Sequence, residues 1–279
     1  MKNSSTYHYL RRIAAEPPFR LASRWLVQKF SRNVETRARW GADAYPYYQF
    51  GILQGACSAK IQGHTAITVV EFGVYTGVGL LNMEKYATQI EMSTGVHIKV
   101  VGFDSGHGLP SFIGDYRDHP DQWSPGSYKM ANFEELANRI DPMRTQLIIG
   151  NVSETVPKFL EGGNFATLGF IAFDLDLYSS TRDALEILRS PKRKMLRQTP
   201  VYFDDINFIT NHRWAGELAA IDEFNSTCES VKIDCWYNIR HDKPFPEAHY
   251  WEKMMVAHDL PAISAVDPSR GTMGGGLVR

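Results

Sequence analysis

Acidic residues follow two apolar segments of this 279-residue chain in a pattern that suits a divalent cation. Asp174 and Asp176 follow the run LGFIAF, and Asp204 and Asp205 follow the run PVYF. Carboxylates that meet from two neighbouring strands repel one another unless a cation lies between them. Oxygen ligands without histidine or cysteine suit Mg²⁺, so the pattern predicts a magnesium site. Asp176 has a second interpretation, as the cap of a helix expected to start near Ser179.

A glycine-containing turn with the sequence EFGVYTGVG, from Glu71 to Gly79, follows an earlier apolar segment. Glycines after a strand let the backbone approach a ligand, and the next helix start offers free N–H groups. The turn lacks the G-x-G-x-x-G and G-K-[ST] motifs, so binding of pyrophosphate or a nucleoside triphosphate loses support. Glu71 inside the turn favours a cationic or hydroxyl-rich ligand instead. Asp104, 33 residues further on, closes the next apolar run, as hydrogen bonding to a ribose diol requires.

Short β-branched runs that alternate with helical stretches are expected to position these residues. The buried strands of a parallel sheet are predicted at Thr65–Glu71, His97–Asp104, Gln146–Gly150, Leu168–Asp174 and Pro200–Asp204. Helices are predicted at 77–93, 131–141, 153–161, 179–190 and Gly216–Asn225, and an antiparallel pair at Val231–Ile239 and Tyr250–His258. The carboxyl ends of parallel strands share one edge, where ligands bind. We therefore expect a doubly wound, mostly parallel seven-stranded α/β sheet with the acids at that edge.

The flanking segments differ from this domain in charge and composition. Residues 1–46 are expected to form a helical N-terminal extension, residues 47–260 the α/β domain, and residues 261–279, which end in GTMGGGLVR, a flexible C-terminal tail. Residues 1–40 carry a net charge of +7, whereas the remaining residues carry −8. The N-terminal helices are the expected contact surface of a homo-oligomer.

The overall composition excludes several classes of protein. A net charge of −1 gives no field that selects nucleic acid or an anionic membrane. Three cysteines are too few for a disulfide framework or a zinc site with paired ligands. The N-terminus lacks the apolar core of a signal peptide, and the chain has no uncharged apolar run of about 18 residues. We expect a cytoplasmic protein whose partner is a small molecule, with no nucleic-acid or membrane partner.

Together, the turns after the first and second strands resemble the cofactor site of class I S-adenosylmethionine-dependent methyltransferases. Glu71, Gly73 and Gly77 fill the first motif of that class, acid-x-Gly-x-x-x-Gly. The stretches FDSGHGLP and DLDLYSST, with the later Asp-Asp pair, resemble the macrocin O-methyltransferase family of metal-dependent enzymes. This resemblance runs from about residue 47 to residue 258. It implies a Rossmann-like methyltransferase fold, with S-adenosylmethionine and Mg²⁺ as cofactors.

The resemblance assigns roles to particular residues. It places the methionine portion against Gly73 and Gly77, and the ribose on Asp104. Two positions depart from the family pattern, because Asn151 stands where an acid would hold the adenine and His107 replaces a phenylalanine-like residue before Gly-Leu-Pro. The implied cofactor-binding residues are Glu71, Gly73, Tyr75, Thr76, Gly77, Asp104, Ser105, Asn151, Val152 and Asp174. The implied magnesium ligands are Asp174, Asp204 and Asp205.

An enzyme of this kind would methylate a hydroxyl of a small molecule, a sugar or another vicinal diol. Mg²⁺ bound to two neighbouring oxygens lowers the pKa of a hydroxyl, and a general base assists the transfer. Asp174 is one predicted catalytic residue. His119 is the predicted base, with His107 and His212 as alternatives.

Two other functions stay open. Asp174 and Asp176 also resemble the D-x-D motif of haloacid-dehalogenase-like phosphatases, in which Asp174 would be the nucleophile and Asp204 and Asp205 extra Mg²⁺ ligands. That chemistry usually needs threonine two positions after the second acid, where this chain has Tyr178, and its nucleophile usually follows the first strand. Alternatively, the fold binds the cofactor without catalysis, as a scaffold.

Overall fold

A seven-stranded sheet forms the centre of the structure, a computed structural model that describes residues 19–112, 114–208, 210–244 and 248–267. The strand order is β3-β2-β1-β4-β5-β7-β6. The first five strands in this order, β3, β2, β1, β4 and β5, pair with one another in parallel. Strand β7 pairs antiparallel with both β5 and β6. The bounds are β1 Ala66–Phe72, β2 His97–Asp104, β3 Thr145–Ile149, β4 Thr167–Phe173, β5 Gln198–Phe203, β6 Val231–Cys235 and β7 Met254–Asp259. This topology confirms the predicted fold class.

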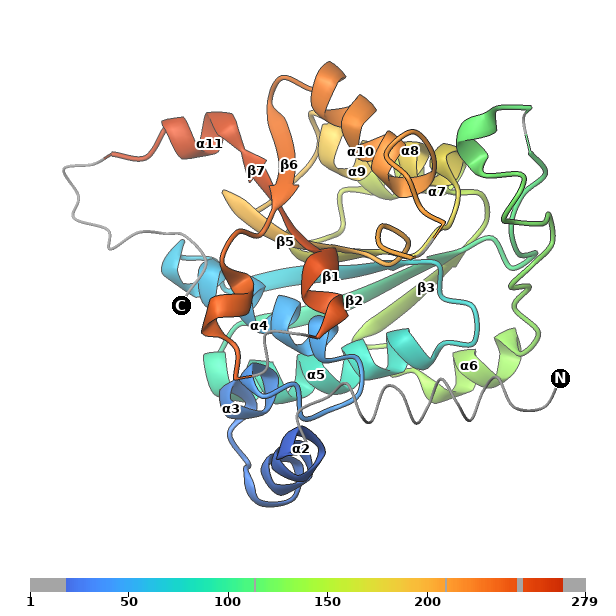
Figure 1. The fold of residues 1–279 in the computed structure, drawn as a ribbon. Helices are drawn as coiled ribbons and strands as arrows, with labels where there is room; N and C mark the ends of the chain where they lie inside the picture. The colour runs from blue at the N-terminus through green and yellow to red at the C-terminus, as the bar shows by residue number, and fades with distance from the viewer. Residues whose placement is uncertain (1–18, 113, 209, 245–247, 268–279) are drawn as a thin grey trace, which may run out of the picture.

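Helices cover both faces of the sheet (Figure 1). One face packs against α3 (Val34–Arg39), α4 (Pro46–Ile61) and α5 (Val78–Thr94). The other packs against α7 (Val152–Gly162), α8 (Tyr178–Ala184), α9 (Glu186–Arg189) and α10 (Gly216–Thr227). The further helical segments of the described residues are α2 (Phe19–Phe30), α6 (Phe133–Arg139), α11 (Leu260–Ser264) and the 3-10 turns η1 (Tyr116–Asp118), η2 (Ile239–Asp242) and η3 (His249–Lys253). The single helix predicted at 179–190 is divided between α8 and α9.

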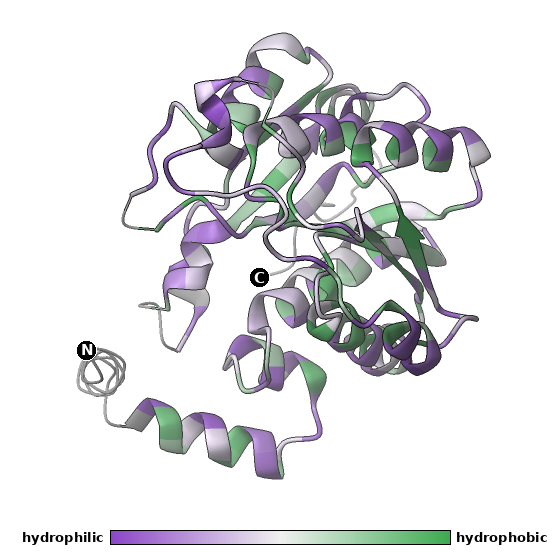
Figure 2. Ribbon diagram, turned by 90° about the vertical axis from the view of Figure 1, so that its right-hand side faces the viewer, coloured by the Kyte–Doolittle hydropathy of each residue, from purple (hydrophilic) through white to green (hydrophobic). Residues whose placement is uncertain are grey.

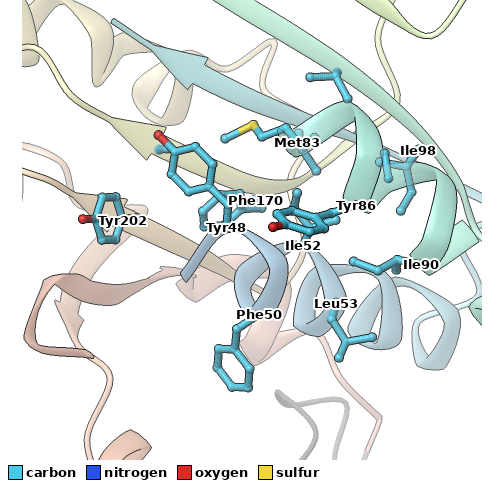
Figure 3. Packing of buried hydrophobic residues seen from close by; sticks show 14 of the residues in the cluster. Tyr48, Phe50, Ile52, Leu53, Met83, Tyr86, Ile90, Ile98, Phe170 and Tyr202 are labelled. Carbon is cyan, nitrogen blue, oxygen red and sulfur yellow. The ribbon is translucent and has the colours of Figure 1, made fainter. Parts of the chain in front are cut away.

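Helix α4 packs directly against the sheet and is buried on most of its surface. Figure 3 shows the apolar cluster that it forms with α5 and the strands, which includes Tyr48, Ile52, Met83, Tyr86 and Phe170. A Cβ atom at Gly51 would lie 2.3 Å from the Phe170 ring, and one at Gly55 would lie 2.0 Å from the carbonyl oxygen of Gly169. Glycine is therefore required at both positions for this close approach. Twelve of the 16 residues of α4 are buried.

The described part of the N-terminal extension consists of α2 and α3. Helix α2 contacts α3 and extends away from the domain (Figure 2). Its exposed apolar residues include Trp25, which is 54% exposed, and Phe30, which is 69% exposed. Contact between copies of the chain through these helices stays a prediction. Within the described residues, no helix combines the length and apolar character that crossing a membrane requires.

The predicted C-terminal tail begins with ordered structure. Helix α11 covers Leu260–Ser264, and the Asp259 carboxylate accepts a hydrogen bond from the Ala262 N–H as its N-terminal cap. Residues 268–279 of the predicted tail and residues 1–18 of the extension lie outside the described residues.

Candidate functional site

A pocket of about 920 Å³ opens at the carboxyl edge of the parallel strands. Each of the five parallel strands contributes at least one lining residue at its end, among them Gly73, Asp104, Ile149, Asp174 and Asp204. The lining also includes the predicted site residues Tyr75, Ser105, Asn151 and Val152. The predicted site residues outside the lining are Glu71, Thr76, Gly77, His119 and Asp205. The edge therefore brings together most, but not all, of the predicted site.

The turn after β1 lies against the end of β4. Gly73 has a φ of +84°, and a Cβ atom there would lie 1.8 Å from the carbonyl oxygen of Asp174. Gly77 also has a positive φ, but its missing side chain faces α6, because a Cβ atom would lie 2.3 Å from Leu136 Cδ1. Thr76 is exposed outside the pocket. Gly73 thus shapes the pocket, whereas Gly77 allows α5 and α6 to pack.

Asp104 at the end of β2 holds this turn in place. Its Oδ2 atom accepts hydrogen bonds from the backbone N–H groups of Val74 at 3.0 Å and Tyr75 at 2.8 Å. Its Oδ1 atom accepts a third from the Gly106 N–H at 2.7 Å. Three charge-assisted bonds fix the carboxylate at the pocket wall. Asp104 therefore orders the turns after β1 and β2 at the pocket wall.

Glu71 lies behind the turn, outside the pocket. It is 2% exposed, and its Oε1 atom accepts a hydrogen bond of 2.9 Å from the Tyr48 hydroxyl. A Cβ atom at Gly79 would lie 1.9 Å from the same oxygen, so α5 can start here only with glycine. Burial raises the pKa of Glu71 to about 8, the Tyr48 hydrogen bond lowers it, and the charge of Asp104 raises it. Through its contacts with Tyr48 and Gly79, Glu71 supports the turn after β1 from behind.

The far end of the pocket is formed by the start of α7. Asn151 is the N-cap residue of α7, and its Oδ1 atom accepts hydrogen bonds of 3.0 Å from the N–H and the hydroxyl of Ser153. Val152 and Ile149 add apolar surface beside it, and Ile149 is 40% exposed. A polar cap next to the exposed Ile149 side chain suits a flat heteroaromatic ring such as adenine.

Three carboxylates meet at the ends of β4 and β5. One oxygen each of Asp174, Asp204 and Asp205 lies within 4.8 Å of the others. Burial, followed by the charges of Asp204 and Asp205, raises the pKa of Asp174 well above its usual range. Burial and the charge of Asp204 raise the pKa of Asp205 to about 7, although Lys253 lowers it. Asp205 Oδ2 has no hydrogen-bond partner among the described residues. An oxygen-only set with mutual repulsion and a buried, unpartnered oxygen fits a hard divalent cation.

Asp176 lies next to this three-carboxylate cluster and lines the pocket. It adopts a left-handed backbone conformation with a φ of +60° and is 8% exposed. The interpretation of Asp176 as a helix cap is wrong, because the Asp118 carboxylate takes that role. Asp118 Oδ1 accepts a 2.8 Å hydrogen bond from the Ser179 N–H, and Oδ2 accepts one of 3.1 Å from the Ser179 hydroxyl. Asp176 instead contacts Asp205 and lines the pocket.

Two charged residues near the three-carboxylate cluster were missed in the sequence analysis. Lys253 Nζ lies 3.1 Å from Asp204 Oδ1 and neutralises part of its charge. Glu217 in α10 is fully buried and accepts a 2.8 Å hydrogen bond from the backbone N–H of Asp205. A signal for Glu217 was present in the sequence, because it shares a helical stripe with Ala220 and Phe224, which are also buried. Lys253 has no comparable local signal.

The predicted base His119 does not reach the pocket. It is 3% exposed, its Nδ1 atom lies 3.2 Å from Asp121 Oδ1, and its ring centroid lies 4.5 Å from that of His212. Its Nε2 atom has no hydrogen-bond partner among the described residues. Of the three candidate histidines, only His107 lines the pocket. The pocket therefore offers Asp176 and His107 to an acceptor hydroxyl.

No protein-family model and no curated protein matches the chain. Among solved structures, it is similar to CalS11, described as a calicheamicin methyltransferase, with a TM-score of 0.50 and 21% identity over 74% of this chain and 83% of that one. The O-methyltransferase NovP aligns with a TM-score of 0.48 and 23% identity over 70% of this chain and 80% of that one. At such identities the comparison establishes the fold alone. The chain has the Rossmann-like α/β fold of methyltransferases.

Proposed function

We propose that this protein is an S-adenosylmethionine-dependent O-methyltransferase that acts on a hydroxyl of a small molecule, a sugar or another vicinal diol, with Mg²⁺. One observation carries the proposal. A single pocket in a methyltransferase fold joins a glycine turn, organised by Asp104, to Asp174 and Asp204, which form the three-carboxylate cluster with Asp205 behind them. The first part suits a nucleoside with a charged tail, and the second suits a cation that holds an oxygen acceptor.

The residues at and just after the ends of β1, β2 and β3 would hold the cofactor. S-adenosylmethionine, when bound, supplies a methyl group activated by its sulfonium charge. Gly73 lets the turn pass close to the Asp174 carbonyl oxygen and lines the pocket where the methionine portion would lie, and Asp104 Oδ1, which accepts one backbone hydrogen bond, keeps a lone pair for a ribose hydroxyl. Asn151 and Val152 flank the place of the adenine ring. Fixing donor and acceptor in one pocket lowers the entropic part of the barrier.

Asp174, Asp204 and Asp205 would hold the metal. Mg²⁺, when bound, supplies a Lewis acid that lowers the pKa of the acceptor hydroxyl. Lys253 restrains Asp204, and the Tyr202 hydroxyl donates a hydrogen bond to the same carboxylate. Both contacts orient Asp204 before a ligand arrives.

A side chain in the pocket must also accept the hydroxyl proton. The geometry favours Asp176 over His119 for this role, since Asp176 lines the pocket beside the three-carboxylate cluster and His119 lies outside it. Burial and the charges of Asp205 and Asp204 raise the pKa of Asp176 to about 8.

Binding and transfer measurements test the proposal. S-adenosylhomocysteine should bind in calorimetry, and radiolabelled methyl should pass from S-adenosylmethionine to members of a panel of glycosides and catechols when Mg²⁺ is present. The Asp174→Asn variant should lose transfer while S-adenosylhomocysteine binding survives, and Asp222→Asn, an exposed change on α10, should retain both. A wild-type protein that binds neither cofactor form would refute the proposal.

The two alternatives predict other results. A phosphatase of the haloacid-dehalogenase type would hydrolyse p-nitrophenyl phosphate with Mg²⁺, yet Asp174 follows β4 rather than the first strand. A non-catalytic scaffold would bind S-adenosylhomocysteine and transfer no methyl group to any acceptor.

A further inference from the structure

Glu217 is a buried carboxylate that the proposed chemistry does not use. It lies in the first turn of α10, is fully buried, and faces the same side as the apolar residues Ala220, Ile221 and Phe224. Burying a carboxylate without partners costs several kcal/mol, so its contacts must offset that cost. An apolar residue would fit the stripe with no such cost. The contacts of Glu217 therefore indicate what the residue does.

Both contacts of Glu217 are with backbone groups beside the proposed metal ligands. Its Oε2 atom accepts a 2.8 Å hydrogen bond from the N–H of Asp205, itself one of the ligands. Its Oε1 atom lies 3.5 Å from the N–H of Leu175, the residue after Asp174, in a longer contact. One carboxylate thus contacts the turn after β5 and the turn after β4. These two turns carry all three acids of the cluster.

We propose that Glu217 is a positioning residue for the metal site, which sets the separation of Asp174 and Asp205 by holding their two turns together. The strands fix Asp174 and Asp204, whose N–H groups donate hydrogen bonds of 3.0 Å to the carbonyl oxygens of Phe72 and Phe173, but among the described residues no strand carbonyl accepts from the Asp205 N–H. Without Glu217 the N–H groups of Leu175 and Asp205 lose an acceptor, and the repelling carboxylates are free to move apart. The inference rests on the proposed function, in which the cluster binds a divalent metal.

Calorimetric titration with Mn²⁺ alone, in the absence of cofactor and acceptor, tests this role in the full-length protein. Glu217→Asp keeps the charge but withdraws the oxygen atoms from both N–H groups. Glu217→Gln keeps the shape but replaces one acceptor by a donor. Loss of metal affinity of about tenfold or more is expected for Glu217→Asp, with a smaller loss for Glu217→Gln, as is usual for residues that orient metal ligands. Asp222→Asn on the same helix should bind Mn²⁺ as the wild type does.

The outcomes separate position from charge. If Glu217→Asp binds Mn²⁺ like the wild type, or if only Glu217→Gln loses affinity, Glu217 acts through its charge and the positioning role is refuted. Binding of S-adenosylhomocysteine should stay unchanged in both variants, because the residues proposed to hold it lie at or just after the ends of β1, β2 and β3. A wild-type protein without Mn²⁺ binding would instead refute the metal site of the proposed function.

Hydrogen exchange of the wild-type protein gives a test that needs no variant. The amide of Asp205 should exchange slowly, whereas that of Asn207, which is exposed in the following loop, should exchange fast. Equal, fast exchange at both residues would refute the hydrogen bond on which the positioning role depends. This measurement holds even if Glu217→Asp fails to fold.

Discussion

Replacing Glu71 by glutamine tests the electrostatics of the buried acid beneath the turn that follows β1. Glu71 is 2% exposed, and burial raises its pKa from 4.5 to about 8. Because the folded state holds this proton more tightly than the unfolded chain does, ionisation at rising pH favours unfolding. The wild type should therefore lose stability between pH 4.5 and about pH 8, and this contribution should be constant above that range.

The size of the effect follows from the two pKa values. At about 1.4 kcal/mol per pH unit, the loss between pH 5 and pH 8.5 is on the order of 4 kcal/mol. In Glu71→Gln the amide oxygen can still accept the Tyr48 hydroxyl, but its N–H₂ group lacks a partner, which costs about 1–3 kcal/mol at every pH. The variant should be less stable than the wild type at pH 5 and more stable at pH 8.5.

Urea unfolding of both proteins at pH 5, 7 and 8.5 measures this crossover. Glu186→Gln is the matched control, since the Glu186 side chain is 46% exposed and pairs with Arg189 on the surface. Its stability should follow the wild-type curve at each pH. Parallel pH profiles for the wild type and Glu71→Gln would show that Glu71 ionises normally in the folded protein, and the reasoning from burial would be refuted.

Three further substitutions have defined outcomes. Gly73→Ala should abolish S-adenosylhomocysteine binding in calorimetry, because the new Cβ would lie 1.8 Å from the carbonyl oxygen of Asp174. The control Gly63→Ala has a positive φ but open space around the new Cβ, so it should lose only about 1–2 kcal/mol of stability to the backbone conformation. Asp104→Ala should weaken S-adenosylhomocysteine binding by about 1–3 kcal/mol, and unaltered affinity would remove Asp104 from the site. Asp118→Ala should lower the free energy of unfolding by about 1 kcal/mol, measured in urea, because it removes the cap on Ser179.

The strands and the acids that follow them were predictable because both signals are local. A buried parallel strand is an uninterrupted apolar run, and the residue after it must lie at the carboxyl edge. Asp104, Asp174 and Asp204 therefore reach one pocket although the chain separates them widely. The same reasoning placed Gly77 in the site because it matches the motif, but in the structure Gly77 faces Leu136 and lies outside the pocket lining.

The position of helix α4 and the contact of Lys253 with Asp204 could not be predicted, for two physical reasons. Helix α4 is buried on nearly all sides, so its sequence lacks the alternation of apolar and polar faces by which a surface helix is recognised. Lys253 reaches Asp204 only because β7 pairs antiparallel with β5, in a register that places Met254 opposite Tyr202. No pattern near residue 253 contains that information.

The acids of the carboxyl edge differ in how their charge is neutralised, and this difference divides the pocket into two parts. Asp104 is satisfied by three backbone N–H groups, whereas burial raises the pKa of Glu71 to about 8 and so favours its neutral form. Asp174 and Asp205 instead face other carboxylates, and the single lysine beside Asp204 leaves a negative excess. A cation is therefore needed to neutralise the carboxylates after β4 and β5, whereas the acids of β1 and β2 need none. For this reason cofactor affinity and metal affinity should respond to separate sets of substitutions, although both ligands would share one pocket.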